Sequence, residues 1–130
     1  MGVVVGYEFT SREDDDEWVW WPGAMTGELF MGAATTLGSV LNMPTGLQEV
    51  PINWVKVDPG PYAAFVDAAL DLKCDRPHGE LGCLLGGVVP LMIMLADNVG
   101  VRLNADTQEK RSYVEWARNQ PFGQRGLRKT

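Results

Sequence analysis

Residues 81–96 contain no charged side chain, and this stretch most limits what the chain can fold into. As a helix it would be about 24 Å long at 1.5 Å per residue, shorter than the roughly 30 Å hydrocarbon layer of a membrane. Gly82, Gly86, Gly87 and Pro90 interrupt it. We therefore expect a buried central helix of a soluble protein, kinked at Pro90, rather than a membrane span.

The length and composition fit one globular domain. A chain of 130 residues with 45% hydrophobic and 22% charged residues can bury a single core. We expect residues 1–120 to form that domain and residues 121–130 to be a mobile basic tail. The N-terminus lacks the features of a secretory signal, so we expect a cytoplasmic protein with reduced cysteines.

The charge of the domain limits its partners. The net charge is −6, and three of the eleven basic residues lie in the last ten positions, so residues 1–120 hold eight bases against seventeen acids. A body this acidic repels phosphate backbones and favours a basic protein as partner. We therefore expect no nucleic-acid partner and no membrane, while the oligomeric state stays open.

Alternating side chains predict the strands. Residues 3–21 have the pattern of a hairpin, with Ser11–Glu17 as a solvated loop, because the consecutive acids Glu13–Glu17 cannot sit in a core. Residues 50–57 alternate in the same way and predict a third strand, which Pro51 favours at a sheet edge.

Helical spacing of apolar residues predicts three helices besides the uncharged one. The first covers residues 24–42, the second begins after Asp58–Pro59, and the third covers residues 108–120. On the second, Asp67 and Asp71 are expected to form a solvated face opposite the core. The fold class is therefore α+β, a small antiparallel sheet of two or three strands covered by about four helices.

The expected face of the first helix and two helix ends carry specific predictions. The apolar face expected on residues 24–42 consists of Met25, Leu29, Ala33, Thr36, Leu37, Val40 and Leu41, widened by Phe30 and Ala34. Gly100 is a candidate C-cap of the uncharged helix, and Asp106 or Thr107 can cap the last one.

Four segments of the chain match a family pattern: Trp20-Trp21-Pro22 with Leu29-Phe30, Met43–Leu47, Val57–Pro59 leading into Tyr62, Phe65 and Val66-Asp67, and His78–Leu85. Over roughly residues 18–100 the chain resembles a family of small uncharacterised actinobacterial proteins, a domain of unknown function. The resemblance implies no activity and no catalytic residue. Trp21, Cys83 and the acid run depart from the family pattern.

Three residues suit metal or nucleophile chemistry, namely Cys74, His78 and Cys83. Zinc needs four ligands for a closed site, and only Asp75 could supply the fourth. A Cys/His nucleophile pair is the other reading. The favoured one is structural, with a partly buried Cys74 and Cys83 in the core. One histidine and no Gly-x-Ser-x-Gly motif give hydrolase chemistry little support, so we expect no metal, no cofactor and no catalytic residue.

The acid run and the tryptophans are the candidate partner-binding residues. The acids can solvate a turn, dock a basic protein or bind a metal, and the tryptophans can fill a core, line a ligand pocket or form a protein interface. The candidate set is Glu13, Asp14, Asp15, Asp16, Glu17, Trp18, Trp20 and Trp54.

This set favours a non-catalytic interaction module that docks a basic partner, of which an immunity or antitoxin-like inhibitor is one form. The alternative is a small-molecule-binding protein or an enzyme with an aromatic pocket. A deep apolar pocket with convergent polar groups would favour the alternative, and a flat acidic and aromatic face would favour the module.

Overall fold

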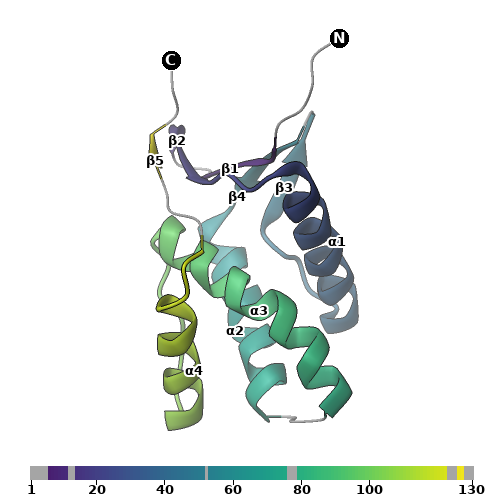
Figure 1. Ribbon diagram of the computed structural model, residues 1–130, viewed down its shortest axis with the longest axis vertical. Coiled ribbons are helices and arrows are strands. Elements are labelled where there is room, and N and C mark those ends of the chain that lie inside the picture. The colour runs from purple at the N-terminus through teal and green to yellow at the C-terminus, as the bar shows by residue number, and fades with distance from the viewer. Residues whose placement is uncertain (1–5, 12–13, 52, 76–78, 123–125, 128–130) are drawn as a thin grey trace.

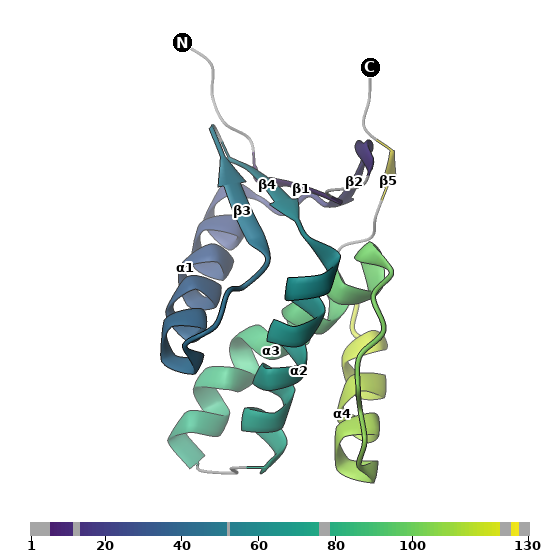
Figure 2. The same ribbon diagram turned by 180° about the vertical axis from the view of Figure 1, so that it is seen from behind.

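The computed structural model describes residues 6–11, 14–51, 53–75, 79–122 and 126–127, without the side chains of 14–17 and 126–127. Within this part of the chain, four helices lie together beneath a mixed sheet (Figures 1 and 2). The fold is α+β, as predicted. The sheet differs from the two or three antiparallel strands expected.

The sheet has five described strands in the order β3-β4-β1-β2-β5. They are β1 (Glu8–Ser11), β2 (Asp14–Trp20), β3 (Leu47–Val50), β4 (Trp54–Val57) and the two-residue β5 (Gly126–Leu127). The central strand β1 pairs antiparallel with β2 and parallel with β4. Local alternation identifies a strand but not a partner distant in sequence, so the parallel pair escaped prediction.

The acid run begins a strand instead of forming the expected loop. β2 starts at Asp14, which pairs with Ser11, and Glu17 pairs with Leu127 of β5. A strand joins its sheet through backbone hydrogen bonds, so acidic side chains do not prevent the pairing. Glu13 lies outside the described residues. β5 also brings part of the expected tail into the sheet.

Most of the strand expected at 50–57 is β4, whereas Val50 is the last residue of a separate strand, β3. Pro51 follows β3 directly, and Asn53 has a left-handed φ of 58°. Such a residue breaks the run of extended backbone, so one alternating pattern becomes two strands. β4 lies between β3 and β1, so the edge position predicted for the strand at 50–57 is wrong: Pro51 lies between β3 and β4 and belongs to neither strand.

The four described helices agree with the predicted segments to within a few residues. They are α1 (Ala24–Leu41), α2 (Pro59–Asp75), α3 (Gly79–Val99) and α4 (Gln108–Arg118). Asn42 ends α1 at a φ of 54°, and Gly100 ends α3 at a φ of 87°, with Val101 N donating to the Ala96 carbonyl. This is the backbone pattern of a glycine C-cap, as predicted for Gly100.

The predicted apolar face of α1 is only partly right, since Phe30, Ala34 and Leu37 are buried as expected but other members are not. Met25, Leu29 and Val40 are exposed, and the buried positions are Gly27, Phe30, Met31, Ala34, Leu37 and Gly38. Two of these are glycines, which a hydrophobic pattern does not count. Their missing side chains let the helix approach its neighbours closely, which turns the buried face toward them.

α3 is the central helix of the core. It is 21 residues long and, by length and composition, apolar enough to cross a membrane, with a mean hydropathy of 1.8 over its most apolar window. Half of that window is buried inside the fold. The buried part runs mainly from Leu85 to Ala96 and includes Pro90, and α2 packs beside it.

Candidate functional site

Two tryptophans of the candidate set flank one threonine on the sheet. The Cα of Thr10 on β1 pairs with that of Trp18 on β2, and Trp54 Nε1 on β4 donates to Thr10 Oγ1 at 2.9 Å. Side chains alternate along a strand, and Phe9 and Val55 enter the core. Trp18, Thr10 and Trp54 therefore lie on the opposite face of the sheet.

Two further side chains extend this face. Trp21 follows β2 directly, is 53% exposed, and its ring centroid lies 6.0 Å from that of Trp18 at a 64° angle. The Lys56 ammonium lies 5.1 Å from the centroid of the Trp54 ring. We call Trp18, Trp21 and Trp54 the tryptophan face. Trp21 was not in the predicted set.

Trp20 does not belong to this face, contrary to the prediction. It is 4% exposed, and its ring centroid lies 5.0 Å from those of Phe9 and Phe30. Trp20 pairs with Phe9 while Trp18 pairs with the next residue, Thr10, so β2 is irregular between them. This bulge sends Trp18 and Trp20 to opposite faces, whereas regular alternation predicts the same face.

The acids Asp14–Glu17 precede Trp18 on the same strand. Within β2, the acidic residues Asp14–Glu17 are therefore direct neighbours of Trp18, a member of the tryptophan face. The segment lies toward one side of the sheet, where β5 pairs with β2 at Glu17 and Trp18. The acid run and the tryptophans, the two features that the sequence singled out, are therefore next to each other in the fold.

A buried lysine joins α2 to α4 through three carboxylates. The Lys110 side chain is 5% exposed, and its Nζ lies 2.6 Å from Asp71, 3.3 Å from Asp75 and 3.1 Å from Asp106. The hydrogen bonds that Lys110 donates to Asp71 and Asp106 raise the pKa of Lys110. A lysine that acts as a base needs a lowered pKa, so this cluster serves as a structural tie.

The same face of α2 holds the segment before α4. Asp67 accepts a hydrogen bond from Asn104 N at 2.8 Å, and burial raises the pKa of Asp67. The prediction of a solvated face at Asp67 and Asp71 therefore holds only in part: the Asp71 side chain is 56% exposed, but the two acids also bind Lys110 of α4 and the segment before that helix. The sequence did contain a signal for this contact. The buried residues of α4 recur at helical spacing, and one of them is a lysine that needs an acidic partner: Lys110, Val114 and Ala117.

The two cysteines differ in their exposure to solvent. Cys74 is buried and Cys83 is exposed, so the expectation of Cys83 in the core is wrong. Burial raises the pKa of Cys74, which opposes formation of a reactive thiolate. His78 lies outside the described residues. Within the described ones, no three His, Cys, Asp or Glu side chains are placed to hold a metal ion.

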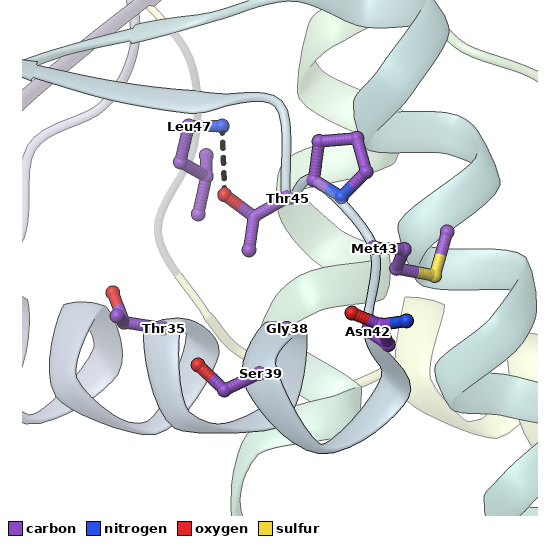
Figure 3. A pocket seen from close by; sticks show the side chains of 8 residues that line it. Thr35, Gly38, Ser39, Asn42, Met43, Thr45 and Leu47 are labelled. Carbon is purple, nitrogen blue, oxygen red and sulfur yellow. Dashed lines mark hydrogen bonds between the residues drawn. The ribbon is translucent and has the colours of Figure 1, made fainter.

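A polar hollow of about 530 Å³ lies between the end of α1 and the segment that leads into β3 (Figure 3). Its lining residues are Thr35, Gly38, Ser39, Asn42, Met43, Pro44, Thr45 and Leu47. Thr45 Oγ1 accepts a hydrogen bond from Leu47 N at 3.1 Å. No lining residue is acidic, basic or a cysteine, so the hydroxyls of Thr35, Ser39 and Thr45 have no general base among the lining residues to activate them.

A family model covers most of this architecture. The model of a family of unknown function, DUF6086, matches residues 9–121, which include the four described helices and most of the sheet. No curated protein and no solved structure matches the chain. The match extends beyond the residues 18–100 over which a resemblance was noted. The chain belongs to this family of unknown function.

Proposed function

We propose that the protein is a non-catalytic interaction module that docks a basic protein through the tryptophan face and the acids at the start of β2. The observation that carries the proposal is the flanking of Thr10 by Trp18 and Trp54, next to the half-exposed Trp21. Tryptophan is enriched in interface hot spots because it buries a large area and keeps one N–H donor.

The charge supports a basic partner. Asp14–Glu17 supply four acids on the strand that carries Trp18, and the whole chain has a net charge of −6. Complementary charges accelerate encounter and disfavour acidic competitors. An immunity or antitoxin-like inhibitor that blocks a basic site remains one form of this function. An actinobacterial origin and a cytoplasmic location are part of the same proposal.

The pockets give less support to the alternative of an enzyme or binding protein with an aromatic pocket. The polar hollow and a second hollow of about 520 Å³ have no aromatic lining residue. A ligand site typically combines apolar or aromatic walls with a few convergent polar groups. The indoles of the tryptophan face line neither hollow.

The test is capture of a partner from extract of the native cells, followed by kinetics with the purified pair. The baits are the wild type, the triple variant Asp14→Asn, Asp15→Asn and Asp16→Asn, Trp21→Ala, and Trp116→Ala. The last is the matched control, because Trp116 is 50% exposed but lies on α4. We expect the wild type and control to retain the same basic protein and the other two baits to lose it.

With the purified partner, the triple variant should slow association, most strongly at low salt. Exposed charges act mainly on the encounter rate and are screened over about 10 Å at 0.1 M ionic strength. Its melting temperature should stay close to that of the wild type, because exposed charges contribute little to stability. Identical retained proteins for all four baits would rule the proposal out.

A further inference from the structure

An apolar groove lies between α1 and α3, on other elements than the tryptophan face. It has a volume of about 520 Å³, and its lining residues are Glu28, Leu29, Gly32, Ala33, Thr36, Leu37, Val40, Leu72, Leu81, Leu84, Leu85 and Val88. Both ribbon views place α1 and the Gly79 end of α3 on the same side of the molecule (Figures 1 and 2). We call this surface the α1–α3 groove.

Exposure separates the base of the groove from its rim. Leu37, Leu85 and Val88 are buried, whereas Leu29 is 69%, Val40 70% and Leu84 76% exposed. A single exposed aliphatic side chain is common on a protein surface, but here several such side chains border one continuous hollow. The groove therefore leaves apolar surface open to water along both of its walls.

The walls repeat at the spacing of a helix. On α1 the lining residues Leu29, Ala33, Thr36 and Val40 are four, three and four positions apart, which spans about 16 Å or three turns. On α3 the lining residues recur in the same way from Leu81 to Val88. A helix that presents apolar residues at i, i+3 or i+4 and i+7 matches both rows.

The charge of the rim is acidic. Glu28 lines the groove, and Asp71 and Asp75 line an adjoining hollow of about 350 Å³ that shares Val40 and Leu72 with it. No residue that lines either hollow is basic. Lys110 offsets only part of the charge of its three carboxylates.

This charge distinguishes between possible occupants. A second copy would bring acids against acids, with a net charge of −6 on each chain. An anionic membrane surface would be repelled by the same rim. A helix with lysines or arginines beside its apolar face satisfies both the apolar walls and the acidic rim.

We propose that the α1–α3 groove binds a basic amphipathic helix of a partner protein. The apolar residues of that helix enter between Leu29, Val40 and Leu84, and its basic residues face Glu28, Asp71 and Asp75. The site uses no residue of the tryptophan face, so it is a second docking surface and goes beyond the function proposed above.

The experiment uses the full chain and a fluorescein-labelled peptide of about 18 leucine and lysine residues in an amphipathic helical pattern. A peptide of the same composition with dispersed leucines is the control ligand. Fluorescence anisotropy should show saturable binding of the amphipathic peptide only. Leu84→Gln and Val40→Gln should each weaken it at least about tenfold.

Two matched variants control for surface changes elsewhere. Met25→Gln removes a side chain that is 76% exposed on α1 but does not line the groove, and it should leave the affinity within about twofold. Trp116→Ala, at a half-exposed position on α4 that does not line the groove, should also leave it unchanged. Circular dichroism should show the same helix content for all variants.

Three results would overturn the proposal. The first is equal binding of the two peptides, and the second is unchanged affinity in both groove variants. The third is another occupant: a wild-type dimer in sedimentation that Leu84→Gln dissociates, or binding to anionic lipid vesicles that the same variant abolishes.

Discussion

The Lys110 ammonium and the Asp71 carboxylate lie 2.6 Å apart and join α4 to α2. The lysine is buried, and the acid lies on the side of α2 that the sequence pattern assigns to solvent. Asp75 and Asp106 complete the cluster. α4 therefore depends on a charged contact as well as on the apolar side chains of Val114 and Ala117.

Replacing Lys110 should destabilise the protein. Lys110→Met leaves Asp71, Asp75 and Asp106 close together without a cation, and we expect the melting temperature to fall by about 5 °C or more. Arg111→Met, at an exposed position on the same helix, should change it little. Thermal unfolding followed by circular dichroism checks this, and equal melting temperatures would contradict the structural role of Lys110.

Alkaline pH should weaken the fold through Tyr113. Burial raises the pKa of Tyr113 to about 12, and the neighbouring Cys74 adds to the shift. The pKa of this phenol is higher in the folded chain than in the unfolded chain, where it is about 10. Its contribution to stability is therefore fully present below about pH 10 and is lost as the pH rises toward 12. The raised pKa of Lys110 acts in the same direction.

In urea titrations the free energy of unfolding should therefore decline between pH 10 and 12, in addition to an earlier decline above about pH 9 from the raised pKa of Cys74. Tyr113→Phe should decline less steeply over that interval. An identical pH profile for the variant and the wild type would show that Tyr113 keeps its ordinary pKa in the folded protein.

Phe65 is fully buried in the middle of α2. Phe65→Ala should lower the free energy of unfolding by roughly 3–5 kcal/mol, because it removes a buried ring and leaves a cavity. A small domain has little stability to spare, so the variant should be largely unfolded at moderate urea. A loss below about 1 kcal/mol would contradict this packing.

Two glycines of α1 should respond to alanine in opposite directions. A Cβ on Gly27 would lie 2.7 Å from the Cβ of Tyr7, whereas a Cβ on Gly32 would meet nothing within 4 Å. Gly32→Ala should stabilise the helix by about 0.4–1 kcal/mol through the entropy of the unfolded chain. Gly27→Ala should destabilise the protein despite the same entropic gain, as measured by urea unfolding of both variants.

The periodic patterns predicted well where the helices lie along the chain, but less well which side of a helix is buried. The segments of α1 to α4 follow from apolar spacing and from end signals such as Gly100. The buried face of α1 followed only in part, because Gly27 and Gly38 contribute close approach rather than apolar area. Hydrophobicity measures area, and it cannot register a contact that depends on the absence of a side chain.

The candidate site shows the same division. The sequence identified Trp18 and Trp54 as candidates, but their position around Thr10 depends on a parallel pair between strands distant in sequence. Trp20 was assigned with them, because a bulge cannot be read from an alternating pattern. Lys110 was missed altogether, since its partner carboxylates lie mostly on another helix.

The order of the strands in the sheet determines when each strand finds its neighbours during synthesis of the protein. β2 finds its second neighbour, β5, only at Gly126–Leu127, although the hairpin of β1 and β2 is complete by Trp20. During synthesis, β2 therefore remains an open edge until residues 126–127 have left the ribosome. An open edge invites pairing with other chains, and charged residues are a common protection against it. The acids Asp14–Glu17 would thus guard the nascent protein against aggregation before β5 arrives.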